Sequence, residues 1–152
     1  FFMPRFSKGF TLVELIAVMV IMSILATSVI NSYSSYNKWQ DINEQVLDIV
    51  NTLRQARDYC MAANEEFYLT VTTGATDSYT LEYKNSSTAL NLPGKDGNVF
   101  TMPSYVDFTA SDVGTDLEFS ILGEPTATRT ITINTNERTI KIVSPTGYIY
   151  AY

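Results

Sequence analysis

The chain has 152 residues, of which 45% are hydrophobic and only 17% are charged, and its formal net charge is −6. It contains no histidine, which excludes Ser-His-Asp and Cys-His nucleophiles and every metal site that needs an imidazole ligand. Its single cysteine excludes an intramolecular disulfide, and its acidic balance disfavours nucleic-acid phosphates as partners. We therefore expect one domain with a modest core, or a smaller domain with an appendage, and no enzymatic activity and no cofactor.

A long apolar segment follows a short basic one near the N-terminus. Residues 1–9 carry two cations, Arg5 and Lys8, and no acid, whereas residues 10–30 contain a single charge, that of Glu14. A helix of that length spans roughly 30 Å, the thickness of the hydrocarbon layer of a bilayer. We therefore predict a single transmembrane helix over residues 10–30. The preceding cations favour an orientation that places the rest of the chain outside the cytoplasm.

The charge of Glu14 helps to decide between a secretory signal, a buried core helix and a membrane segment with a partner. A cleavable secretory signal ending near Ala26-Thr27-Ser28 would have the same basic and apolar parts. It would also carry an unpaired carboxylate in its apolar core, which costs on the order of a few kcal/mol at membrane depth. A core helix, apolar on every side, would need more cover than a domain of this size offers. A charge in this position therefore indicates a partner for Glu14.

The segment KGFTLVEL, residues 8–15, resembles the processing motif of type IV pilins and of the pseudopilins of type II secretion. The resemblance implies that prepilin peptidase removes residues 1–9 by cutting between Gly9 and Phe10, and that the same enzyme methylates the new N-terminal amine of Phe10. It also implies that Glu14 pairs with the methylated amine of a neighbouring subunit. Such a pairing would select the register of the assembly, because an unmatched carboxylate in hydrocarbon is costly.

An apolar stripe with alternating spacings of three and four residues continues the helical pattern beyond the first segment. Its members are Trp39, Ile42, Val46, Ile49, Leu53, Ala56 and Cys60. We predict that residues 31–64 extend the helix and pack its stripe against a sheet, with Cys60 as a buried free thiol. A free coiled coil is the alternative, although only about three heptads are present.

The remaining residues, 65–152, change to a period of two and predict a β-rich domain. The expected strands are 66–72, 78–84, 105–109, 116–121, 128–134, 138–143 and 147–152. The last three strands alternate cleanly and indicate an antiparallel meander, while residues 84–97 lack periodicity and predict an exposed loop. The fold class is therefore α+β, with a long N-terminal helix packed on C-terminal antiparallel sheets.

The end of the helical segment resembles that of the GspH/FimT minor pseudopilins. The matching residues are Asn51-Thr52-Leu53-Arg54-Gln55-Ala56-Arg57 with Asn64, and Gly123-Glu124-Pro125 and Gly147 match the C-terminal part of that family. The resemblance implies two antiparallel sheets packed on the helix. It also implies that the chain is a minor subunit, either of a type IV pilus or of a type II secretion pseudopilus. Adhesion pili of the mannose-sensitive haemagglutinin type are among the type IV pili concerned. Its partners would be prepilin peptidase, other pilin subunits and the inner-membrane assembly platform, with its β domain in the periplasm before assembly.

Three alternatives remain for the β domain. Some FimT-like proteins bind DNA, and Arg129, Arg138 and Lys141 with the tyrosines of residues 148–152 are the candidate surface. A calcium site could use Asp107, Asp112, Asp116 and Glu118, although a solvated acidic loop explains the same residues and we expect no metal. A simple anchored periplasmic binding domain is the third. We expect Arg54 and Arg57 to lie on a solvated helix face, with contacts to Asp58 or Glu65.

Overall fold

The computed structural model describes residues 9–86, 88–109, 116–135 and 137–152, and within this part the side chains of residues 28–32 are not described. The chain divides into two compact units, Phe1–Gln40 and Asp41–Tyr152. A single helix, α1 (Leu12–Ala63), contributes residues to both units. The helix ends where Asn64 adopts a left-handed conformation with φ of 57°, which asparagine tolerates better than most residues.

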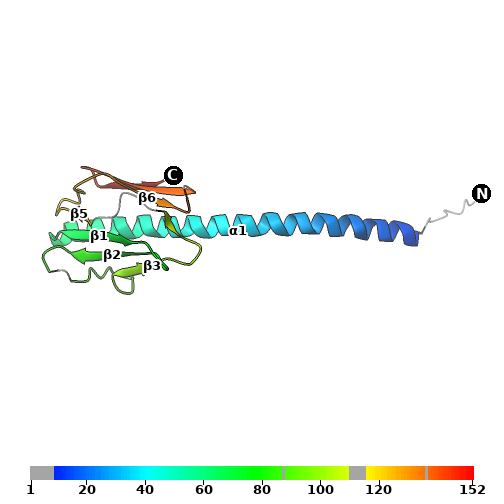
Figure 1. The fold of residues 1–152 in the computed structure, drawn as a ribbon, viewed down its shortest axis with the longest axis horizontal. Coiled ribbons are helices and arrows are strands. Elements are labelled where there is room, and N and C mark those ends of the chain that lie inside the picture. Colours follow the sequence, from blue (N-terminus) through cyan, green and yellow to red (C-terminus); the bar gives the residue numbers. More distant parts are fainter. Residues whose placement is uncertain (1–8, 87, 110–115, 136) are drawn as a thin grey trace, which may run out of the picture. The chain divides into compact units, whose positions relative to one another are not determined.

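The second unit contains two antiparallel four-stranded sheets that gather around the C-terminal part of α1 (Figure 1). The first sheet has the order β3-β2-β1-β5 and the second has the order β4-β6-β7-β8. The strands of the first sheet are β1 (Phe67–Thr72), β2 (Ser78–Tyr83), β3 (Val99–Thr101) and β5 (Leu117–Phe119). Those of the second are β4 (Phe108–Thr109), β6 (Arg129–Ile133), β7 (Arg138–Val143) and β8 (Tyr148–Ala151).

The α+β class and the antiparallel sheets are confirmed, and β6, β7 and β8 form the predicted meander. Asn134 and Thr135, both with positive φ, lie in the turn between β6 and β7, while Asn136 lies outside the described residues. Strand β3 was not predicted. It is only three residues long, and its pairing with β2 defines it better than any local pattern does.

The core of the second unit joins the apolar stripe of α1 to the inner faces of both sheets. The helix contributes Ile42, Val46, Ile49, Val50, Leu53, Ala56 and Cys60, each at most 3% exposed. Cys60 is a buried free thiol, as predicted, and burial together with the charge of Glu65 raises the pKa of Cys60 to about 11. Trp39, in contrast, is 49% exposed and does not belong to the stripe. Helical periodicity continues through Trp39, but periodicity alone does not show where the covering sheets begin.

The segment between β2 and β3 is not the exposed loop that was predicted. Leu90 and Leu92 are buried in the core, and the backbone N–H of Leu90 donates to the carbonyl oxygen of Leu81 in β2. Lys95 contacts both carboxylate oxygens of Asp48 on α1 at 2.6 and 2.8 Å. The segment is thus fastened to both β2 and the helix, because two leucines two residues apart give it a buried side despite its irregular backbone.

Candidate functional site

The first turn of α1 is held by a reciprocal hydrogen-bonding arrangement between Thr11 and Glu14. The backbone N–H and the hydroxyl of Thr11 donate to Oε2 of Glu14 at 2.9 and 2.8 Å. The backbone N–H of Glu14 lies 3.3 Å from the Thr11 hydroxyl oxygen. This is a capping box, which satisfies N–H groups that the helix itself leaves without acceptors. It places the Glu14 carboxylate at the very start of the helix, three residues after Thr11.

Gly9 and Phe10 lie immediately before this cap, in exposed, non-helical backbone. The Phe10 side chain is 86% exposed, and no heavy atom of the described residues lies within 4 Å of the place where a Cβ would stand on Gly9. The peptide bond between Gly9 and Phe10 is therefore sterically open to an enzyme. Residues 1–8 of the predicted leader lie outside the described residues.

The helical segment that follows the cap exposes almost all of its large apolar side chains. From Leu12 to Leu25 these side chains are between 49% and 75% exposed. Exposed apolar side chains in such number mark an interaction surface. Among the described residues, no stretch of helix combines the length and hydropathy needed to cross a membrane. The transmembrane prediction for residues 10–30 is therefore not supported, and the side chains of residues 28–30 lie outside those described.

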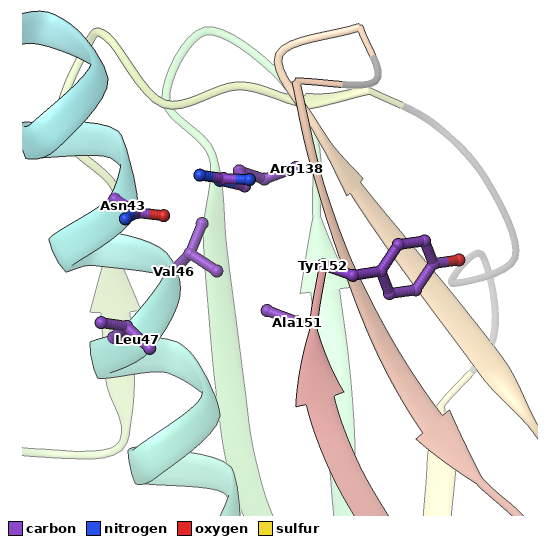
Figure 2. Close-up of a pocket in the computed structure, with 6 residues that line it drawn as sticks. All are labelled: Asn43, Val46, Leu47, Arg138, Ala151 and Tyr152. Atoms are coloured by element: carbon purple, nitrogen blue, oxygen red, sulfur yellow. The ribbon is translucent and has the colours of Figure 1, made fainter. Parts of the chain in front are cut away.

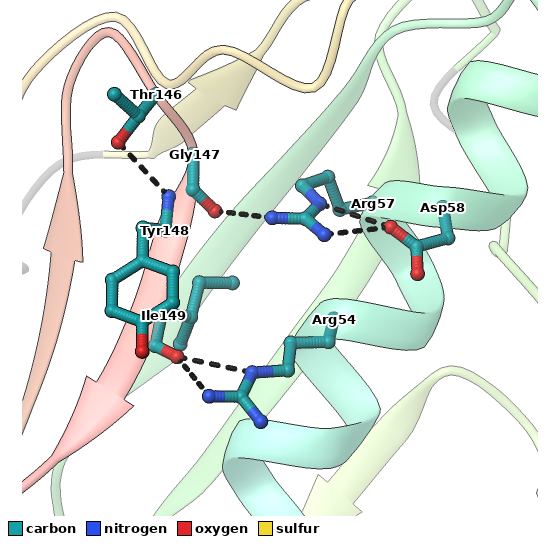
Figure 3. A network of polar contacts seen from close by, with 7 residues as sticks. All are labelled: Arg54, Arg57, Asp58, Thr146, Gly147, Tyr148 and Ile149. Atoms are coloured by element: carbon teal, nitrogen blue, oxygen red, sulfur yellow. Dashed lines mark hydrogen bonds and ion pairs between the residues drawn. The ribbon is translucent and has the colours of Figure 1, made fainter.

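Arg54 and Arg57 do not lie on a solvated face, because both reach from α1 to the last strand region (Figure 3). Nε and Nη2 of Arg54 donate to the carbonyl oxygen of Ile149 at 3.0 and 2.5 Å. Nη1 of Arg57 donates to the carbonyl oxygen of Gly147 at 2.7 Å, and its Nη2 contacts Asp58 Oδ1 at 2.8 Å. The expected contact with Asp58 is thus confirmed. The bonds to Gly147, just before β8, and to Ile149 in β8 were missed because they join residues 90 and 95 positions apart.

The three basic residues proposed as a DNA surface do not form one patch. In the β6–β7 register Arg129 stands opposite Ile142 and Arg138 opposite Ile133, so the two arginines lie at opposite ends of the hairpin. Lys141 lies between the buried residues Ile140 and Ile142 in β7. Its side chain therefore points to the face of the sheet opposite these two isoleucines. The spacing in the sequence suggested a cluster, but the alternation of side chains along a strand separates it.

The tyrosines of β8 form a column next to Lys141. Ring centroids are 5.5 Å apart for Tyr148 and Tyr150 and 5.8 Å apart for Tyr150 and Tyr152. Tyr150 stands opposite Lys141 in the register. The aromatic rings therefore contact one another along the strand, and a single cation accompanies them on that face of the β7–β8 pair.

Two of the candidate calcium ligands are engaged elsewhere. Asp116 accepts a hydrogen bond of 2.6 Å from the Thr70 hydroxyl, and Glu118 forms an ion pair with Lys84. Asp112 lies outside the described residues. Within the described part of the chain, no group of three or more acidic, histidine or cysteine side chains is placed to hold a metal ion.

The N-terminal segment of the chain matches a known family model. Residues 4–30 match the family model of the prokaryotic N-terminal methylation motif. The chain carries a prokaryotic N-terminal methylation motif. The matched range includes Gly9, Phe10 and Glu14, whose individual roles remain predictions. This motif points to a type IV pilin-like precursor and to a structural subunit rather than an enzyme. No curated protein and no solved structure matches the chain.

Thr11 is a site residue that the sequence analysis missed as such. A threonine three residues before a glutamate, directly ahead of an apolar run, is the sequence signature of a capping box. The motif resemblance drew attention to the charge of Glu14 and left its local hydrogen-bonding partner unexamined. The structure shows that the methylation motif and a helix cap share the same residues.

Proposed function

We propose that the chain is a minor pilin or pseudopilin subunit. Prepilin peptidase cuts between Gly9 and Phe10 and methylates Phe10, residues 10–30 anchor the subunit in the inner membrane, and the β domain lies in the periplasm. The subunit then joins a type IV pilus or a type II secretion pseudopilus and supports filament assembly, protein secretion or adhesion. The observation that carries the proposal is the methylation motif over residues 4–30.

The exposed apolar side chains between Phe10 and Leu25 support the proposal, because lipid or neighbouring subunits would supply the cover that the chain does not. Lipid tails are as apolar as leucine, so leaving the bilayer for a filament brings no hydrophobic gain by itself. Selectivity for the filament must then come from specific packing and from the charge of Glu14.

The GspH/FimT assignment is also part of the proposal. The residues that carry this resemblance lie together in the folded domain: Arg57 donates to Gly147, and a Cβ on Gly123 would stand 2.8 Å from Cγ of Arg57. Residues widely separated in sequence thus form one contact region at the end of α1. DNA binding is not proposed, because Arg129, Arg138 and Lys141 are separated by the register.

The decisive experiment is the intact mass and N-terminal sequence of the protein purified from membranes of cells that express a prepilin peptidase. A chain that starts at Phe10 and carries one added methyl group is expected. A chain that starts after Ser28 would indicate an ordinary secretory signal, and an uncut chain would indicate a simple anchored protein. Either result would overturn the proposal.

A matched variant makes the test specific. Gly9→Val is expected to remain uncut, because a branched side chain then occupies the position that precedes the scissile bond. The space around Gly9 is open, so this substitution should leave the fold intact. Gly74→Val, at another glycine with open space around it, should be processed normally. Equal processing of Gly9→Val and the unaltered chain would show that the cut lies elsewhere.

A further inference from the structure

A cavity of about 230 Å³ lies between α1 and the last two strands of the second unit (Figure 2). Its walls are formed by Asn43, Val46, Leu47, Arg138, Ala151 and Tyr152. Pockets for drug-sized ligands and cofactors usually measure about 300–1,000 Å³, so this cavity is too small for most of them. Its volume suits one side chain or the end of a peptide.

The backbone of β8 leaves a hydrogen-bonding position open beside this cavity. Thr139 and Tyr152 exchange both of their backbone hydrogen bonds, so the peptide groups of Ile149 and Ala151 point away from β7, toward the free edge of the sheet. Arg54 occupies this edge at the carbonyl oxygen of Ile149. No arginine of α1 is bonded at Ala151 among the described residues, and Ala151 lines the cavity instead.

The polar groups of the cavity include the guanidinium of Arg138 and the side-chain amide of Asn43. The guanidinium of Arg138 points toward the side chain of Asn43 across the cavity (Figure 2), and both belong to its wall. A guanidinium beside an amide and a peptide N–H is a suitable environment for a carboxylate. Val46 and Leu47 add an apolar wall along α1, and Leu47 is 53% exposed at the rim.

We propose that this cavity binds a carboxylate on a short aliphatic stem, carried by an extended peptide segment of a partner protein. The carboxylate meets Arg138 and Asn43, the stem packs on Val46 and Leu47, and the segment's backbone pairs with the open edge at Ala151. Adding a segment to a strand edge, with side-chain pockets for specificity, is a general mode of peptide recognition. The proposal goes beyond the filament role and does not depend on processing at Gly9, so the two can fail separately.

The carboxylate could belong to the C-terminus of a peptide or to an acidic side chain, and three probes distinguish these sources. We would titrate the ¹⁵N-labelled full chain in detergent micelles with acetyl-Gly-Leu, with acetyl-Leu-Asp amide and with acetyl-Gly-Leu amide. Saturable shifts of the Ala151 amide are expected with at least one of the first two probes and not with the third. Binding of the uncharged amide with equal affinity, or no saturable shift with any probe, would overturn the proposal.

Variants of two arginines at opposite ends of the same hairpin provide the matched control. Arg138→Gln is expected to weaken probe binding by roughly ten-fold or more, since a charged hydrogen bond is lost. Arg129→Gln, which replaces an arginine that does not line the cavity, should leave the affinity unchanged within about two-fold. Equal losses in the two variants would contradict a local role for Arg138.

A rim variant keeps the test valid if Arg138→Gln disturbs the fold. Leu47→Trp places a larger apolar side chain at a half-exposed position and leaves β7 unaltered. It should fill the cavity and abolish the Ala151 shifts while other backbone resonances stay in place. Unchanged probe binding in Leu47→Trp would show that the probes bind elsewhere and would overturn the proposal.

Discussion

Gly147 occupies a position where two turns of the second unit meet and where no side chain fits. A Cβ there would overlap the carbonyl oxygen of Gly123, and the backbone has a φ of 64°, which favours glycine. Gly147→Ala should therefore lower the free energy of unfolding by about 3 kcal/mol, through overlap and backbone strain together. Urea unfolding followed by circular dichroism measures the loss.

Gly74→Ala is the control for this prediction. Gly74 has open space around its Cβ position and no positive φ, so alanine should change the stability by less than about 1 kcal/mol. If Gly147→Ala proved as stable as Gly74→Ala, the close approach of Gly123 and Gly147 would not exist in solution.

Asp77 and Asp107 form a carboxyl pair that makes stability depend on pH. Asp77 is buried and accepts backbone N–H bonds from Gly74, at 2.9 Å, and from Phe108. The hydrogen bond to Asp77, with smaller effects of burial and of the Asp77 charge, raises the pKa of Asp107 above its usual 3.8.

The sign of the effect follows from linkage. The folded chain binds the Asp107 proton more tightly than the unfolded chain, so this stabilising contribution is complete below about pH 3.8 and is lost as the pH rises through the folded-state pKa. Asp107→Asn should therefore raise the melting temperature at pH 7 relative to the unaltered chain, and the difference should shrink or reverse near pH 4. A difference that did not vary with pH would contradict the pairing.

At the scale of the elements, the contacts of Arg54 and Arg57 show how the edge strand β8 is held. The outward carbonyl of Ile149 is bonded by two nitrogen atoms of Arg54, and that of Gly147 by Arg57. Strand edges with unsatisfied carbonyl groups invite pairing with other chains, and native proteins commonly cover them. The two arginines therefore fasten β8 to α1 and cover the first part of its edge.

Arg54→Met should remove this fastening. We expect a loss of about 1.5–3 kcal/mol in the free energy of unfolding, the range for hydrogen bonds to charged groups, and faster hydrogen exchange at the Tyr150 amide. The free energy of unfolding of Arg54→Lys should lie between those of the unaltered chain and of Arg54→Met. Lysine has a single terminal nitrogen, so it cannot place two nitrogen atoms on one carbonyl oxygen as the planar guanidinium does. Unchanged exchange throughout β8 in Arg54→Met would mean that the bond does not hold the strand.

The elements themselves were largely predictable, and the contacts between them were not. The stripe from Ile42 to Cys60 and the alternation in β6 and β7 are local periodicities that hydrophobic burial imposes on a sequence. Leu90 and Leu92 were missed, because two apolar residues in an irregular segment give no period to recognise. The bond from Arg54 to Ile149 forms only because α1 and β8, which are far apart in the sequence, lie side by side in the fold. No local sequence pattern predicts that contact.

At the scale of the whole molecule, Glu14 has two separable properties, a helix cap and a charge. Glu14→Ala removes both, and Glu14→Gln keeps the cap, since glutamine also serves in a capping box, while removing the charge. If the charge selects the filament, both variants should be processed normally and both should enter filaments less than the unaltered subunit does. Quantitative immunoblotting of sheared filaments against membrane fractions measures incorporation.

The loss of the cap alone should cost about 1 kcal/mol of helix stability. Normal incorporation of Glu14→Gln, together with reduced incorporation of Glu14→Ala, would therefore assign the function to the cap and not to the charge. Normal incorporation of both variants would remove Glu14 from the assembly mechanism altogether.

The long sequence separation between Arg54 and its acceptor also affects how the molecule is made. Ribosomes add about 5–20 residues per second, so the 95 residues from Arg54 to Ile149 correspond to roughly 5 to 19 seconds of synthesis. During that interval the apolar stripe of α1 has been translated, but the strand that completes its cover has not. The nascent chain is thus most exposed to aggregation and proteolysis just before β8 emerges, and a factor that binds unfolded chains would find its substrate at that stage.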